Sequence, residues 1–455
     1  MPNRRTFLQT SLGAAAALAS PRTAFPTAGP RLPRRSALAE ALAAGDGATR
    51  RALAPAPARP RAAVAPPSLA ERFPDLPRHF VFEYYPWYQA EPWQHWDQWH
   101  RTPPDDLAAN HMPRLGAYDS RSRAVIEQHA QWIVSTGAGA VNLSWWGPDS
   151  AEDRAVPLIM DVMKDHGLKV TFHLEPYRDD HGRRMASDIL YLLRRYGEAR
   201  GWDAFLLLRN SDGRTGPVFK GFRTILPASA TDCHGVTSDI PDYTPDDVFA
   251  RQLDSLRRDL RGEFDRVTVL ADSIDFIRTS RAGFDGIAIY DNFIPPSRYE
   301  ALAGRATETG LVFSFNVNPG YDTIEPRVLP PDSCHRALPF APTAEGIDWT
   351  QAADRERAAR LSTERISESF ERTVALQADS ALVNVGVGFL LVYLNSFNEW
   401  HEGHAFEPMR DAAALTEAER RVGYHNPARG DYRLTHLTGA LAAVLGRTTR
   451  TGESA

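Results

Sequence analysis

Three glutamates stand where apolar, strand-like segments end, and these are positions at which carboxylates can do chemistry. Glu175 follows the segment 168–174, while Glu399 and Glu402 follow the segment 389–394 and are three residues apart. A carboxylate buried at the end of a strand must be paired or functional, because burying an unpaired charge is costly. Two carboxylates in one loop can also raise each other's proton affinity. The three residues therefore predict acid–base catalysis.

Aromatic side chains gather near the same segment ends. Seven of the ten Trp residues fall after the first two strand-like segments or beside Glu399. Aromatic rings pack against the C–H faces of sugars, and carboxylates and amides bind sugar hydroxyls. The composition of these clusters predicts a carbohydrate-binding cleft. The clusters are 83–88, 93–99, 144–147, 173–177, 290–292, 316–322 and 396–403.

Short apolar segments alternate with longer amphipathic ones from His79 onward. The strands that we expect are 79–84, 140–145, 168–174, 205–208, 267–271, 286–290, 311–317 and 389–394, and the helices are 123–135, 151–165, 185–196, 245–260, 298–309 and 349–377. Eight strands with intervening helices predict an α/β fold, a (β/α)8 TIM barrel with extended βα loops, whose site lies at the C-terminal strand ends. A doubly wound open sheet is the alternative, but no glycine-rich turn follows the first strand.

The charge is divided unevenly along the 455 residues. The net charge of −5 separates into +8 for residues 1–68 and −13 for the remainder, an acidic balance that argues against a nucleic-acid partner. Residues 1–19, with Arg4 and Arg5 before an Ala-rich run, resemble a twin-arginine signal peptide, which implies export by the twin-arginine machinery to the periplasm or outside the cell. Residues 20–68 are rich in Ala, Pro and Arg and predict a disordered tether, which leaves 69–455 as a single folded domain. No stretch has eighteen uninterrupted apolar residues, so we expect no membrane span.

Eight collinear motifs make the chain resemble glycoside hydrolase family 99, the retaining endo-α-mannosidases. They cover nearly the whole chain after the tether. The last one, Asn398-Glu399-Trp400-His401-Glu402-Gly403, is the most specific. The motifs lie at 85–88, 95–96, 118–120, 144–147, 175–177, 284–286, 319–322 and 398–403, with Glu407-Pro408 following.

The resemblance implies an endo-acting α-mannosidase that acts on an oligo- or polysaccharide. It assigns the catalytic roles to two residues: Glu399 as base on the sugar's own 2-hydroxyl and Glu402 as acid on the departing oxygen, by way of a 1,2-anhydro sugar. We expect a monomer that needs neither a cofactor nor a metal. The implied substrate-binding residues are Tyr88, His95, Trp146, Glu175, Tyr290 and Asn398.

Two segments depart from the pattern of that family. The segment Ile324-Glu325-Pro326-Arg327-Val328 stands where family members commonly read IRPWN, which leaves the aglycone preference open. The segment His404-Ala405-Phe406 stands where they have a Thr-Gln-Ile type run.

Other functions remain open at this point. A conventional two-carboxylate glycosidase would use Glu175 as nucleophile or base with Glu399 or Glu402 as acid. A non-catalytic glycan-binding barrel is a further alternative. Another is a metal-dependent hydrolase, since His173 and Glu175 share one face of a strand and His401 lies near Glu402. Cys233 and Cys334 either pair or stay free.

Overall fold

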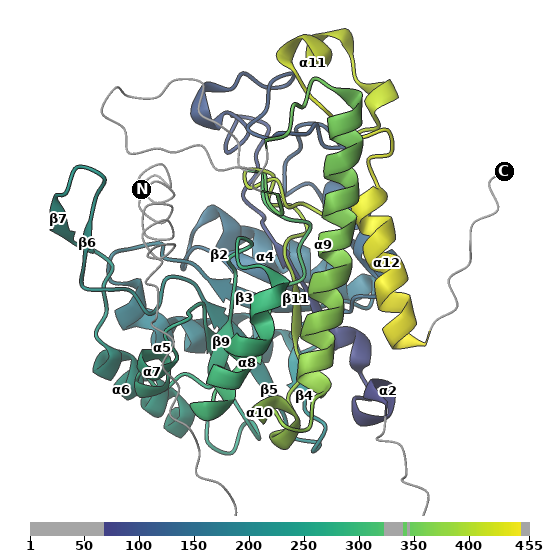
Figure 1. The fold of residues 1–455 in the computed structure, drawn as a ribbon. Coiled ribbons are helices and arrows are strands. Elements are labelled where there is room, and N and C mark those ends of the chain that lie inside the picture. The colour runs from purple at the N-terminus through teal and green to yellow at the C-terminus, as the bar shows by residue number, and fades with distance from the viewer. Residues whose placement is uncertain (1–67, 323–339, 344–345, 447–455) are drawn as a thin grey trace, which may run out of the picture.

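Eight parallel strands form the centre of the molecule in the computed structural model, which describes residues 68–322, 340–343 and 346–446 (Figure 1). Neighbouring strands follow the order β10-β9-β8-β5-β3-β2-β1-β11. This arrangement confirms the predicted (β/α)8 TIM barrel. The barrel strands are β1 (Phe80–Tyr84), β2 (Ala140–Trp145), β3 (Lys169–Leu174), β5 (Thr215–Gly221), β8 (Thr268–Ala271), β9 (Gly286–Ala288), β10 (Val312–Ser314) and β11 (Val392–Leu394).

The two ends of the sheet meet just beyond β10. The backbone N–H of Val317 donates to the carbonyl of Tyr393 at 2.8 Å, and the N–H of Asn395 donates to the carbonyl of Val317 at 2.8 Å. These bonds form a parallel bridge between Val317 and Leu394. The first and the last strand are also paired, so the barrel is nearly closed.

The fourth barrel strand is not the segment 205–208 that the apolar pattern predicts. Phe205 makes a single parallel bridge with Val170 of β3, but residues Leu207–Arg209 form β4, which pairs antiparallel with β5, and β5 takes the place in the barrel. The sequence of β5 contains Gly216, Pro217 and Lys220, which are poor strand formers. Gly216 is required there, because a Cβ atom would overlap the carbonyl of Arg266.

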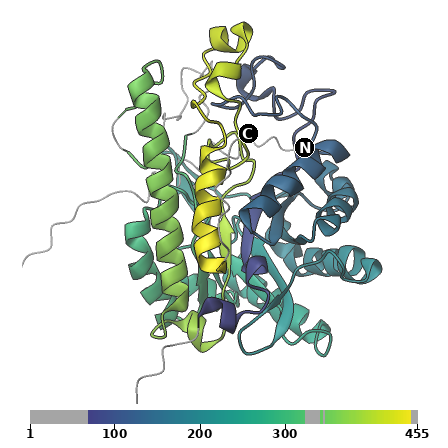
Figure 2. The same ribbon diagram turned by 90° about the vertical axis from the view of Figure 1, so that its right-hand side faces the viewer.

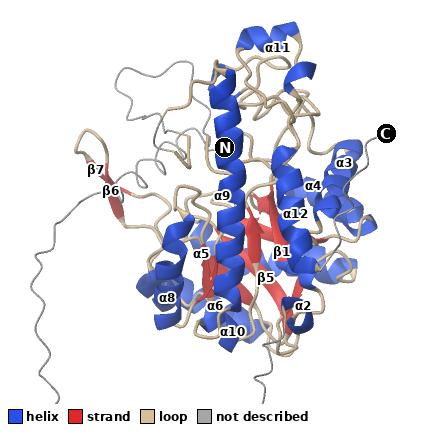
Figure 3. Cartoon of the chain, turned by 45° about the vertical axis from the view of Figure 1, so that its right-hand side comes forward, coloured by secondary structure: helices blue, strands red, loops and turns tan. Residues whose placement is uncertain are grey.

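Helices surround the strands, and long loops gather beyond one end of the barrel (Figure 3). Helices α9 and α12 pack side by side along the barrel (Figure 2). The loops after β1 and β11 pack against each other through an apolar cluster that includes Tyr85, Trp96 and Trp400. The helices are α2 (Leu69–Arg72), α3 (Arg123–Thr136), α4 (Ala151–Asp165), α5 (His181–Leu192), α6 (Asp246–Asp259), α7 (Phe276–Arg281), α8 (Tyr299–Glu308), α9 (Ala352–Ala378), α10 (Val383–Gly386), α11 (Glu417–Val422) and α12 (Tyr432–Leu445).

A short two-stranded hairpin lies outside the barrel sheet. Strands β6 (Ser229–Thr231) and β7 (Thr237–Asp239) form a two-stranded hairpin, and Cys233 at its tip is disulfide-bonded. Cys334, the other cysteine of the chain, and residues 1–67, which contain the predicted signal and nearly all of the tether, lie outside the described residues. Within the described residues, no helix is long and apolar enough to cross a membrane.

Candidate active site

Glu402 lies in the loop that follows β11, and only 7% of its surface is exposed. Its Oε2 atom accepts a hydrogen bond from the hydroxyl of Tyr290 at 3.0 Å and lies 2.9 Å from Nε2 of His404. Both partners are themselves buried. A carboxyl group held between a hydroxyl and an imidazole, away from bulk water, is suited to holding and transferring a proton.

A second tyrosine fixes the direction of the hydrogen bond to Glu402. The hydroxyl of Tyr85 donates to the hydroxyl of Tyr290 at 3.1 Å, so the Tyr290 proton is directed to the carboxyl group. Burial, followed by the negative charge of nearby glutamates, raises the pKa of Tyr85 well above its ordinary value. Tyr85 therefore stays protonated and remains a donor at neutral pH.

Glu399 is fully buried in the same loop. Its Oε1 atom accepts a hydrogen bond from the backbone N–H of His401 at 3.2 Å and lies 3.5 Å from Nδ1 of that residue. Nε2 of His401 lies 3.0 Å from the carbonyl oxygen of His95, which only accepts, so this nitrogen carries a hydrogen. Glu399 is thus held in place by the backbone of its own loop and lies beside the ring of His401.

Glu175 follows β3 and is 2% exposed. Its Oε1 atom accepts a hydrogen bond from the hydroxyl of Ser144 at 2.7 Å, and Nε1 of Trp146 donates to the same hydroxyl at 3.0 Å. Its Oε2 atom is buried and has no hydrogen-bond partner within the described part of the chain. A carboxylate oxygen left in this state is ready to accept a hydrogen bond from a sugar hydroxyl.

Aromatic rings connect the segment after β1 to the loop after β11, which carries Glu399 and Glu402. Trp87 stacks with His95 at 5.0 Å between ring centroids and lies 6.3 Å from Trp146. His95 stacks in turn with His401 at 5.7 Å, and Tyr88 meets the same ring edge-on at 5.5 Å. The structure therefore brings Tyr88, His95 and Trp146 into one aromatic group, and their contact with substrate stays a prediction.

Asn398 is engaged with the protein backbone. Its Oδ1 atom accepts from the N–H of Tyr85 at 2.8 Å, and its Nδ2 atom donates to the carbonyl of Tyr85 at 3.0 Å. This pair of bonds ties the β11 loop to the end of β1. The geometry gives Asn398 a positioning role, while the predicted contact with substrate is untested.

A buried ion pair lies inside the barrel at the level of β1. Nζ of Lys220 is 2.7 Å from Oε1 of Glu83, and Nδ1 of His173 is 3.1 Å from Oε2 of the same residue. Burial raises the pKa of Glu83, but the charges of Lys220 and His173 outweigh it and lower the pKa to about 2. His173 therefore contacts Glu83 as part of this buried cluster. Among the described residues, no group of three or more His, Cys, Asp or Glu side chains could hold a metal ion.

Several site residues had no assigned role in the sequence analysis. Tyr85 and Ser144 lie in the quoted motifs, but the motifs do not say what their hydroxyls contact. Glu407 accepts hydrogen bonds from the Tyr118 hydroxyl at 2.8 Å and from Nε1 of Trp400 at 2.9 Å, so it helps to hold the loop that carries Glu399 and Glu402. His404 contacts Glu402, and the only hint of this in the sequence is that the segment 404–406 departs from the family pattern.

Known proteins resemble this chain in sequence. The family model for glycosyl hydrolase family 99 matches residues 77–211. The glycoprotein endo-alpha-1,2-mannosidase of Xenopus laevis is 26% identical over 341 residues, and that of Mus musculus is 27% identical over 345 residues; each alignment covers 71% of this chain. The chain spans 63% and 64% of the length of these two relatives.

A solved structure supports the fold independently. The structure of the family 99 endo-alpha-mannosidase from Bacteroides thetaiotaomicron matches with a TM-score of 0.55 at 20% identity, covering 83% of this chain and 99% of that one. At this identity the likeness shows the shared barrel. The sequence likeness to glycosyl hydrolase family 99 is carried by residues 77–211 and by the two relatives named above.

Proposed function

We propose that the protein is an exported, endo-acting α-mannosidase that hydrolyses α-mannosidic bonds in mannan-like or N-glycan-like polysaccharides. The observation that carries this proposal is the placement of Glu399 and Glu402 in one buried loop, each with an imidazole beside its carboxyl group. The names of the sequence relatives support the same substrate class. The rest of the site supplies what such a substrate requires, since aromatic rings and the buried Glu175 lie close to the loop.

The first step of the proposed reaction needs no nucleophile from the protein. Glu399 takes the proton from the 2-hydroxyl of the sugar, and the 2-oxygen attacks the anomeric carbon. The bond from that carbon to the leaving oxygen breaks, and Glu402 gives its proton to the leaving oxygen. In an α-mannoside both oxygens are axial and lie on opposite faces, so the attack comes from behind the breaking bond.

The second step opens the resulting 1,2-anhydro sugar. Glu402, now a carboxylate, takes a proton from water, and the water oxygen attacks the anomeric carbon. The bond to the 2-oxygen breaks, and Glu399 returns its proton to that oxygen. Two inversions restore the α configuration and leave both carboxyl groups as they began.

The test uses a panel of α-mannan, N-glycans and an activated α-mannosyl disaccharide with purified enzyme, and it follows reducing ends. The wild type should hydrolyse α-mannosides, and Glu402→Gln should lose at least about 100-fold in kcat on polysaccharide, because general acid catalysis contributes about 100- to 10,000-fold. Glu300→Gln, on an exposed position of α8, is the matched carboxylate control. Equal activity of Glu402→Gln and wild type, or no release by wild type, would contradict the proposal.

The second candidate is a conventional two-carboxylate glycosidase with Glu175 as nucleophile. The unpartnered, buried Oε2 atom of Glu175 favours it. This mechanism forms a covalent glycosyl ester, whereas the 1,2-anhydro route leaves no carbohydrate on the protein. Mass spectrometry after reaction with a slow 5-fluoro-mannosyl substrate, which keeps the 2-hydroxyl, separates the two: an adduct on Glu175 supports the second candidate, and unmodified protein with continued turnover supports the first.

A further inference from the structure

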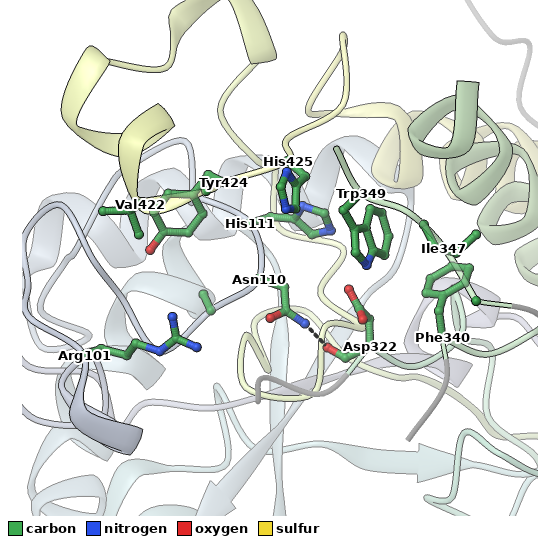
Figure 4. A pocket seen from close by; sticks show the side chains of 13 residues that line it. Arg101, Asn110, His111, Asp322, Phe340, Ile347, Trp349, Val422, Tyr424 and His425 are labelled. Atoms are coloured by element: carbon green, nitrogen blue, oxygen red, sulfur yellow. Dashed lines mark hydrogen bonds between the residues drawn. The ribbon is translucent and has the colours of Figure 1, made fainter. Parts of the chain in front are cut away.

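A cavity of about 360 Å³ lies beside the catalytic loop, and none of Glu175, Glu399 and Glu402 lines it (Figure 4). Its walls come from the loop after β1, the end of the segment after β10, the residues before α9 and the residues after α11. The side chains that line it and matter here are Arg101, Asn110, His111, Asp322, Trp349 and His425.

Asp322 is shared between this cavity and the catalytic loop. Its backbone N–H donates to the carbonyl of Glu402 at 3.0 Å, and its own carbonyl accepts a hydrogen bond from Nδ2 of Asn110. Gly403 has φ +65°, and a Cβ atom there would collide with the carbonyl of Asp322, so the two segments are pressed together. Asp322 therefore lines the cavity and also contacts the loop that carries Glu402, so the position of the cavity relative to this loop is fixed.

The cavity combines aromatic rings with polar groups. Figure 4 shows Trp349, His111 and His425 close together, with Asn110 and Asp322 below them in this view. The ring of His111 meets that of Trp349 edge-on at 5.7 Å, and the ring of His425 is parallel to that of Trp349 with 6.3 Å between centroids. Aromatic rings beside amide and carboxylate groups are the composition that sugars require.

The cavity is lined by one cationic and one anionic side chain, Arg101 and Asp322, so its charges do not select a charged ligand. Burial, followed by the charge of Arg433, lowers the pKa of His111 to about 3, and burial lowers the pKa of His425 as well, so both rings are neutral at neutral pH. The guanidinium of Arg101 lies 3.5 Å from the carboxylate of Asp106. Nδ1 of His111 is buried and has no hydrogen-bond partner among the described residues, which leaves a polar atom for a ligand hydroxyl.

We propose that this cavity is a further subsite that binds one uncharged sugar unit of the glycan, beyond the units at the bond that is cleaved. The proposal rests on the proposed function, which requires a polysaccharide to lie across the end of the barrel. The volume falls within the range of about 300–1,000 Å³ that is typical of small-ligand sites. Trp349 and His425 lie outside residues 77–211, so the subsite belongs in part to a region that the family model does not match.

The test compares Trp349→Ala with wild type on two substrates: α-mannan, and an activated α-mannosyl disaccharide, which offers only the two sugar units at the cleaved bond. The ratio of kcat/KM on α-mannan to kcat/KM on the disaccharide should fall about 10-fold, chiefly through KM, because one aromatic contact with the sugar is lost. Trp349→Phe, which keeps an aromatic face, should restore most of the ratio. Ile277→Ala, a 57% exposed position on α7, is the surface control.

Two outcomes overturn the subsite, and a third bears on the proposed function alone. An unchanged ratio shows that the cavity binds no sugar, and equal losses on both substrates show that Trp349 only supports the catalytic loop. If the wild type cleaves neither substrate, the proposed function fails. The subsite is then still tested by calorimetry with α-mannan oligosaccharides, in which Trp349→Ala should weaken binding about 10-fold.

Discussion

At the scale of single residues, the hydrogen bonds from Tyr85 to Tyr290 and from Tyr290 to Glu402 predict how the activity depends on pH. Tyr290 already accepts from Tyr85, so its own proton stabilises the charged form of Glu402. Tyr290→Phe removes this donor and disfavours the carboxylate. The alkaline limb of kcat/KM against pH should therefore move about one unit to higher pH, since a hydrogen bond to a charged group contributes about 1.5 to 3 kcal/mol. Initial rates between pH 5 and 10 measure it.

Tyr85→Phe is the graded control for this prediction. It leaves the Tyr290 hydroxyl in place but removes the bond that directs it, so the alkaline limb should move in the same direction by a smaller amount. A limb that stays in place in Tyr290→Phe, or moves to lower pH, would show that the hydroxyl does not act on the catalytic proton.

The residue scale also shows the limit of a sequence reading. That Glu399 and Glu402 lie together in one buried loop could be predicted because they share one short motif, and their catalytic roles stay a prediction. The hydrogen bond between Tyr85 and Tyr290 joins residues 205 positions apart, and that between Tyr290 and Glu402 joins residues 112 positions apart. Such contacts depend on the closure of the barrel, which no local pattern encodes.

At the scale of elements, the ion pair between β1 and β5 predicts a stability effect. Lys220→Met leaves Glu83 buried beside His173 without its closest cation. Removing one partner of a buried pair costs about 3 to 5 kcal/mol, because the other charge stays buried. The free energy of unfolding at pH 7, measured by urea denaturation, should fall by about that amount.

The double variant Glu83→Leu/Lys220→Met separates the pair from simple packing. It should regain most of the loss, because apolar side chains can replace a buried pair at little cost. The pKa of Glu83 is about 2, below its ordinary value of 4.5, so the stability from this group is present above pH 4.5 and is lost as the pH falls toward 2. Wild type should lose about 3 kcal/mol more than the double variant over that range. Parallel acid curves for the two proteins would contradict the pairing.

The same ion pair explains why the fourth strand was mispredicted. The segment 205–208 is apolar and looks like a buried strand, whereas β5 contains glycine, proline and lysine. The lysine is tolerated inside the barrel only because Glu83 of β1 meets it. The other seven barrel strands could be predicted, because they are buried and their sequences are runs of mostly apolar residues.

At the scale of the whole molecule, the order of assembly bears on export. Strand β1 at residues 80–84 pairs with β11 at residues 392–394, so the barrel closes only after nearly all of the chain is made. A route that carries folded proteins suits such a chain, and the resemblance of residues 1–19 to a twin-arginine signal is in keeping with it. The disulfide of Cys233 fits an oxidising compartment as well.

Export by this route predicts a specific effect of the paired arginines. The double substitution Arg4→Lys/Arg5→Lys should retain the protein inside the cell, because the signal is read through its two arginines. Arg34→Lys/Arg35→Lys changes another adjacent pair by the same chemistry, outside residues 1–19, and should leave export intact. Immunoblots of cell fractions from a bacterial host with the twin-arginine machinery measure both variants.

The retained protein also distinguishes a failure of export from a failure of folding. If the barrel forms before export, the retained Arg4→Lys/Arg5→Lys protein should cleave the same substrate as wild type, while thiol alkylation should find Cys233 reduced, because the cytosol keeps thiols reduced. Retained protein without activity would mean that folding depends on export or on the disulfide. Unchanged export of Arg4→Lys/Arg5→Lys, or equal retention of the Arg34→Lys/Arg35→Lys control, would show that residues 1–19 are not read as a twin-arginine signal.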